Sequence, residues 1–387
     1  FSYCKDGKGI WKELDINQKA VYLVDGCGTY GHPWVIQDVS REGGVQTLFT
    51  GEDQMMTVMK LLDDTGRNGT AIKINTEILN TKMAGQSVEI KVHTDQTGDA
   101  SADMVFIKNG NTWVEATRAG NRYVQKTDSN ATLTNEQVMA YLRNGYFQIK
   151  KDLTLNVAQF TGFGKNDVSR AFSGVIVGDT ADRKITLTGE NTTGEVGGLI
   201  RYSQGSVVKN LKIVFDGVKI NGNSTETFFG GVIGWVIGGD NIIDNVTLTV
   251  NNGKKVSCAS NLTAVGGYVG MVGGYVKTVG STTIDYSKKG GGVVFRKISS
   301  AGLTSMFDIE KKKDIQTDTE VSAENKNYYW NPYVGRVFDG YVCAEDSCSG
   351  MGTNTDKNYT IPKLNNSDKL KITGDGKLDI TVDGKNK

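Results

Sequence analysis

The sequence predicts a mainly β protein: a right-handed parallel β-helix (a solenoid) with short capping α-helices and a hairpin-rich side segment. Three observations lead to this prediction. A Gly-Gly motif recurs in the middle of the chain, which is typical of stacked repeats. Glycine is abundant and proline scarce, 49 residues against 3, as in turn-dense β folds. Two amphipathic helical patterns precede the repeats.

The repeat is a short apolar run opened by Gly-Gly, followed by a turn and a second run of alternating apolar residues. The first copy occupies residues 197–213, the second residues 230–248, and a third begins at Gly266. One copy cannot bury its apolar face alone, so neighbouring copies must stack. Each unit shows two clear strands, whereas a β-propeller blade has four, so the β-helix is preferred to the propeller.

The corners of the repeat carry residues with special backbone properties. Glycine is expected where two backbones approach closely or where φ is positive. Asn210 and Asn245 begin the second strand of their copies. Asparagine at such a position can bond its own backbone or the equivalent asparagine of the next copy.

The pattern Gly-Gly-(Leu/Val)-Ile-(Gly)-(aromatic), followed by Asn-(Leu/Val)-x-(Ile/Leu), resembles the GLUG repeat of large bacterial surface proteins. Residues 171–187 are similar to the coil that precedes such repeats, and residues 331–337 to a later segment of these proteins. The resemblance covers residues 29–279, and Arg201 departs from it by replacing a glycine. It implies a secreted or cell-surface β-helix, often part of an adhesin, and it transfers no catalytic residue.

Composition narrows the possible functions. Forty-four Lys and Arg balance 43 Asp and Glu, for a formal charge of +1, so we expect no nucleic-acid partner. No apolar run approaches the roughly 18–20 residues that span a bilayer, so we expect no membrane insertion. The two histidines are far apart, the cysteines lack zinc spacing, and no nucleotide-binding fingerprint is present. We therefore expect no metal and no cofactor.

Two helices are expected at the front of the chain, where they would cap an open end of the β-helix. The first follows Thr50, with an acid three residues later, nearly a capping box. Its apolar face is rich in methionine (Met55, Met56 and Met59), for which core packing is preferred to partner binding. The second follows Thr134 and Gln137, a full capping box.

Strands are expected after both helices, at residues 70–75, 147–150 and 153–155. Between the two helix–strand units, residues 84–130 alternate and are predicted to form hairpins, with a turn at residues 109–111. We divide the chain into front strands, helices and hairpins (1–165), the repeat core (166–305), and an aromatic segment with a disulfide loop (306–387).

The aromatic segment contains the candidate ligand-binding residues. A carbohydrate platform is one interpretation, since aromatic faces stack on sugar rings and arginine donates to hydroxyls and carboxylates. A hydrophobic plug at the end of the β-helix is the preferred alternative. The candidates are Tyr328, Tyr329, Trp330, Tyr333, Arg336 and Tyr341.

The cysteines allow two disulfides in an oxidising compartment, Cys343–Cys348 across a polar turn and Cys4–Cys27. Cys258 is left over and is expected to be a small buried apolar residue. The odd number of cysteines leaves the disulfide state open.

The acids near the coils, Asp216, Asp240 and Asp244, show no repeated spacing that would pair carboxylates for catalysis. We therefore expect a non-catalytic surface module for adhesion, for glycan or protein binding, or for use as a rigid spacer. Its partner would be a glycan or a host or bacterial surface protein, beside other domains of a longer chain. The alternatives are a polysaccharide lyase or glycoside hydrolase on the same scaffold, and a self-assembling filament or surface-layer subunit.

Overall fold

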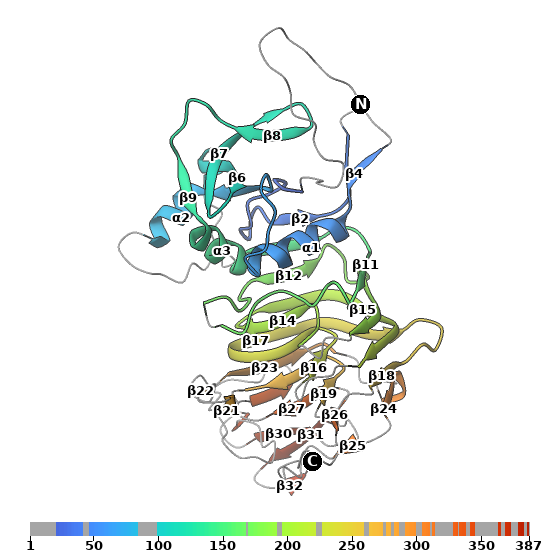
Figure 1. The fold of residues 1–387 in the computed structure, drawn as a ribbon. Helices are drawn as coiled ribbons and strands as arrows, with labels where there is room; N and C mark the ends of the chain where they lie inside the picture. The colour runs from blue at the N-terminus through green and yellow to red at the C-terminus, as the bar shows by residue number, and fades with distance from the viewer. Residues whose placement is uncertain are drawn as a thin grey trace.

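The protein is mainly β, with extensive parallel sheets that follow an antiparallel N-terminal part (Figure 1). The computed structural model describes residues 21–41, 46–83, 99–167, 169–191, 196–221, 227–258, 263–273, 276–279, 282–285, 291–298, 304–309, 312–313, 328–331, 333–337, 341–344, 363–364, 368–372, 378–382 and 385–386. All structural statements below concern these residues.

The N-terminal part begins with short strands and then alternates helices with strands. Its elements are β1 (Tyr22–Leu23), β2 (Trp34–Ile36), β3 (Val39–Ser40), β4 (Thr47–Phe49), α1 (Gly51–Leu62), β5 (Ala71–Asn75), α2 (Thr76–Met83), a 3₁₀ turn (Ala100–Ala102), β6 (Asp103–Asn109), β7 (Thr112–Ala119), β8 (Arg122–Gln125), β9 (Thr132–Thr134) and α3 (Asn135–Arg143). Strands β1, β5, β6, β7 and β8 form one sheet in that order, with β9 paired to β7. We call the antiparallel strands β5 to β9 the hairpin lobe.

Both predicted helices are confirmed, together with their caps. Thr50 accepts the N–H of Asp53, and the Asp53 carboxylate accepts the N–H of Thr50. Thr134 and Gln137 exchange the same two bonds at α3. On α1, Met55 and Met59 are buried, which confirms a packing role for most of the methionine face.

The predicted β-hairpin with its turn at residues 109–111 is also confirmed, since β6 and β7 pair in antiparallel around Gly110, whose φ is 62°. Helix α2 was not predicted, because it follows β5 with no intervening loop. The Asn75 side chain caps it by accepting the N–H of Ile78 at 3.0 Å. Residues 84–98 of the expected hairpin segment lie outside the described residues.

The parallel part consists of strands that pair with a strand of the following copy, and β15 and β17 are the longest of them, with 14 and 18 residues. They are β10 (Tyr146–Ile149), β11 (Leu153–Asn156), β12 (Val175–Gly178), β13 (Lys184–Asn191), β14 (Ile200–Gln204), β15 (Val207–Ile220), β16 (Thr227–Gly230), β17 (Ile233–Val250), β18 (Val256–Cys258), β19 (Thr263–Gly266), β20 (Val269–Val272), β23 (Gly291–Arg296), β24 (Phe307–Ile309), β26 (Tyr328–Asn331), β27 (Val334–Val337) and β28 (Tyr341–Ala344). One parallel series runs β2–β10–β12–β15–β17. It then continues from β17 to β23 and from β23 to β28.

Three further parallel series run beside the first. One joins β11, β13, β15, β18 and β24, the second joins β14, β17, β20 and β27, and the third joins β16, β19 and β26. Apolar side chains from all four series share one continuous core that reaches α1 and α3. In Figure 1 these helices lie across the N-terminal end of the series of parallel strands, which we call the parallel stack.

The corners of the stack show why its sequence carries asparagine and glycine. Asn210 and Asn245 both adopt positive φ, 56° and 52°, and the Asn245 Nδ2 donates to the Asn210 Oδ1 at 3.0 Å. Of the two predicted options, a bond to its own backbone or a bond to the equivalent asparagine of the next copy, the structure shows the bond between equivalent asparagines. At Gly230 a β-carbon would lie 2.2 Å from the Ile233 carbonyl oxygen, so glycine is required there by close backbone approach.

The register extends the repeat further than the sequence pattern does. Val334 and Arg336 pair with Val269 and Met271, so β27 repeats β20 as β20 repeats β17. Gly335 occupies the same tight position, because a β-carbon on it would lie 2.6 Å from the Gly270 oxygen.

Smaller antiparallel sheets complete the described chain. They are the hairpin β21 (Val276–Val279) with β22 (Thr282–Asp285) and a four-stranded sheet of β29 (Lys363–Leu364), β30 (Asp368–Ile372), β31 (Leu378–Val382) and β32 (Lys385–Asn386). Strand β25 (Lys312–Lys313) pairs with β26. Since β26 to β28 join the parallel sheets, these sheets continue past residue 305, the predicted end of the repeat core.

Candidate functional site

The predicted aromatic platform falls on the last described copies of the parallel stack. Tyr333 is only 1% exposed, and its ring stacks on Tyr268 with the centroids 6.2 Å apart and lies edge-on to Phe295. The register places Tyr333 in the core beside Tyr268, its equivalent in the preceding copy, so its ring is buried rather than open to a ligand. Arg336 is partly buried beside the neighbouring strand. The backbone positions of Tyr328, Tyr329, Trp330 and Tyr341 are known, while their side chains lie outside the described part.

Of the predicted Cys4–Cys27 pair, only Cys27 lies in the described part of the chain. Cys27 is a free thiol, 1% exposed, with its Sγ 3.6 Å from the Thr29 Oγ1. Burial raises the pKa of this thiol, so it stays protonated and unreactive near neutral pH. Cys258 is buried, as expected for a small apolar residue. Cys4 and Cys348 lie outside the described residues, so the Cys343–Cys348 bridge stays a prediction.

Two carboxylates near the coils, Asp216 and Asp182, form ion pairs with lysines. Asp216 lies 2.8 Å from the Lys254 Nζ, and the hydrogen bond from Lys254 lowers the pKa of the Asp216 carboxyl. Asp182 is paired with Lys212, whose hydrogen bond lowers the pKa of the Asp182 carboxyl in the same way. Glycosidic general acids instead need a raised pKa.

The other charged residues near the coils that the structure describes lie in separate surroundings. Asp244 lies in register between Lys209 and Arg296. Arg201 packs over the Tyr202 ring, 5.4 Å from its centroid. Within the residues that the structure describes, no three acidic, histidine or cysteine side chains gather as a metal site.

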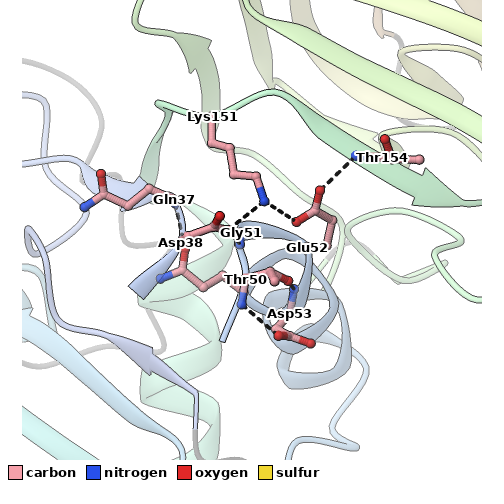
Figure 2. A network of polar contacts seen from close by, with 9 residues as sticks. Gln37, Asp38, Thr50, Gly51, Glu52, Asp53, Lys151 and Thr154 are labelled. Atoms are coloured by element: carbon pink, nitrogen blue, oxygen red, sulfur yellow. Dashed lines mark hydrogen bonds and ion pairs between the residues drawn. The ribbon is translucent and has the colours of Figure 1, made fainter. Parts of the chain in front are cut away.

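A polar network closes the N-terminal end of the stack where α1 begins (Figure 2). The N–H of Thr154 on β11 donates to the Glu52 Oε1 at 3.0 Å. Lys151 bridges Glu52 at 3.1 Å and Asp38 at 2.6 Å. Asp38 also accepts the N–H of Gly51. Although partial burial acts in the opposite direction, the bonds from Lys151 and Gly51 lower the pKa of the Asp38 carboxyl. These contacts give strand β11 a partner at its outer edge and attach α1 to it.

A second polar cluster joins the hairpin lobe to the helices, and sequence reasoning missed it. Lys108 on β6 is 5% exposed, and its Nζ donates to the Asn135 Oδ1 at 2.9 Å. The indole N–H of Trp113 on β7 donates to the same oxygen at 3.0 Å. The Asn135 Nδ2 donates to the carboxylate of Asp64, just beyond α1. We call Lys108, Trp113, Asn135 and Asp64 the Asn135 cluster.

Burial sets the ionisation of the Asn135 cluster. Desolvation lowers the pKa of the Lys108 amine, an effect that the Asp64 and Glu136 carboxylates oppose. The sequence contained a signal for this cluster. Lys108 lies two residues after Phe106 on the same strand, so both side chains point to the same, buried face. A lysine in the buried phase of a strand requires a partner.

In comparisons with known proteins, no protein family, curated protein or solved structure matches the chain. In the described part of the chain, no helix has the length and apolarity that a membrane crossing requires.

Proposed function

We propose that the parallel sheets wind into a right-handed β-helix and that the chain is a non-catalytic extracellular module of a bacterial surface protein. The observation that carries this proposal is the register of the stack. Four series of strands pair in parallel over successive copies, so each copy extends the one before it. Repeats that share a continuous core form a stiff rod rather than a flexible linker.

The resemblance to GLUG repeats is supported by the corners of the stack. At Gly198, Gly230, Gly231 and Gly266 of the Gly-Gly motifs a β-carbon would clash with backbone oxygens, and the asparagines bond to each other between copies. These features explain the motif physically, so the motif has a structural role. Placement at a cell surface rests on the resemblance alone.

Of the expected roles, a rigid spacer is the best supported. With Tyr333 in the core, adhesion through a glycan would rest on Tyr328, Tyr329, Trp330, Arg336 and Tyr341. The lyase or hydrolase alternative is disfavoured, because Asp216, one of the three coil carboxylates considered for it, forms an ion pair with Lys254. A filament that grows from the N-terminal end is disfavoured by α1 and by Glu52, which occupy that end (Figure 2).

One experiment separates these roles. The purified chain is incubated with a panel of host and plant polysaccharides, and both retention and new chain ends are measured. A spacer gives neither signal. Retention that Trp330→Ala abolishes and Tyr333→Phe preserves would establish glycan binding instead, since Tyr333→Phe keeps the core ring. New chain ends would overturn the non-catalytic proposal.

A further inference from the structure

The Asn135 cluster places an amine against an amide in a buried site. The orientation of the Asn135 amide is unambiguous, because Lys108 and Trp113 only donate hydrogen bonds while the Asp64 carboxylate only accepts them. The carbonyl oxygen therefore faces the amine and the NH₂ group faces the carboxylate. The Lys108 nitrogen is 2.9 Å from this oxygen, which is bonded to the carbon that a nucleophile would attack.

Three features of the site favour attack by the amine. Burial lowers the pKa of Lys108, which increases the neutral and nucleophilic fraction of the amine. The Trp113 N–H already donates to the oxygen on which negative charge would develop. Asp64 accepts a hydrogen bond from the nitrogen that would leave, and it is exposed to solvent on its other side.

Folding holds these groups in place. Asn135 is the first residue of α3, and its backbone N–H donates to the Asn111 oxygen in the hairpin turn. Asp64 has a φ of 60°, a left-handed conformation that ends α1. Four separate elements thus fix the amine, the amide and the carboxylate, the kind of preorganisation that accelerates an intramolecular reaction.

We propose that Lys108 and Asn135 form an intramolecular isopeptide bond. The Lys108 Nζ attacks the Asn135 Cγ, and the new C–N bond forms as the carbonyl electrons move to Oδ1. A proton passes from Nζ to Nδ2, carried by the Asp64 carboxylate. The Cγ–Nδ2 bond then breaks and ammonia leaves, so an amine and an amide become a new amide and ammonia without any oxidant or cofactor.

The bond would join β6 of the hairpin lobe covalently to α3. It would lock the lobe onto the helices that cover the parallel stack, independently of compartment redox state and of any ligand. This inference does not depend on the proposed function, although a covalent lock suits a module under mechanical load.

Mass spectrometry of the purified full-length chain tests the proposal. We expect an intact mass lower than the sequence mass by one ammonia, and after digestion a branched peptide that contains both Lys108 and Asn135. Lys108→Arg should restore the full mass, because arginine keeps the charge but forms no such amide. Lys126→Arg is the matched control, since Lys126 pairs with Glu115 on the surface, and should keep the mass loss.

Two further variants keep the test decisive if Lys108→Arg folds poorly. Asn135→Asp would lose water instead of ammonia and give a product of the same mass as the wild-type product. Asp64→Asn should slow or abolish the reaction. A folded wild-type chain of full sequence mass would overturn the proposal. So would an ammonia loss that maps to an unbranched peptide at Asn109-Gly110, where succinimide formation produces the same change in mass.

Discussion

The N-terminal part, residues 21–143, and the parallel stack, residues 146–344, are held together in different ways. In the stack, the same contacts recur from copy to copy: apolar columns, tight glycine corners and bonds between stacked asparagines. In the N-terminal part, the polar contacts occur once each, as in the Asn135 cluster and the Glu52–Lys151 network. Repetition spreads stability over many equivalent sites, whereas single contacts concentrate it in a few side chains.

The largest expected effect comes from adding a methyl group at a corner of the stack. At Gly266 a β-carbon would lie 1.8 Å from the Val269 oxygen of the same copy and 2.7 Å from the Gly335 nitrogen of the next copy, so backbone must move both within and between copies. We expect Gly266→Ala to lower the free energy of unfolding by about 3 kcal/mol, measured by denaturant titration.

Gly197→Ala is the matched control, because its nearest neighbour is the end of the Asn191 side chain, at 3.2 Å, which can move. We expect this control to stay within about 1 kcal/mol of wild type. Equal effects of the two substitutions would show that corner packing does not limit the stability of the stack.

A pH titration sharpens the comparison, since each part contains a buried tyrosine. Burial raises the pKa of Tyr141 in α3 and of Tyr268 in the stack well above the ordinary value of 10. Above pH 10 the unfolded chain loses these protons while the folded chain keeps them, so stability present below pH 10 is lost as pH rises. Above pH 10 we expect the free energy of unfolding to fall by about 1.4 kcal/mol per pH unit for each tyrosine.

Tyr141→Phe and Tyr268→Phe should each remove the contribution of one tyrosine, about 1.4 kcal/mol per pH unit, from the dependence of the unfolding free energy on pH above pH 10. Thermal melts or denaturant titrations between about pH 9 and 11 measure this slope. If neither variant changes this slope, the loss of stability at alkaline pH has another source, and the buried tyrosines do not cause it in either part.

The smallest expected effect concerns the asparagine column. Asn245→Ala removes the bond to Asn210 and places alanine at a φ of 52°, so we expect a loss of about 1–2 kcal/mol. Asn245→Gly removes the same bond, but glycine tolerates the positive φ. The difference in unfolding free energy between the two variants, measured by denaturant titration, therefore gives the cost of placing alanine at this φ. Identical losses would mean that the side-chain bond alone matters.

Local signals predicted most of the elements correctly. The capping boxes at Thr50 and Thr134, the hairpin turn at Gly110 and the stacked asparagines all depend on a few neighbouring residues or on an exact repeat. Helix α2 was missed because its cap, Asn75, is also the last residue of a strand. The candidate site was predicted less well, since Tyr333 looks the same in sequence whether its ring faces solvent or core.

The sequence by itself determined the mainly β class, the parallel repeat, both capped helices and the corner residues, because these follow from short-range backbone chemistry and apolar periodicity. Only the tertiary structure decided that Tyr333 lies in the core, that Cys27 is a free buried thiol and that Lys108 meets Asn135. These outcomes depend on which strands lie side by side after residues far apart in the chain have come together. Neither composition nor local pattern contains that register.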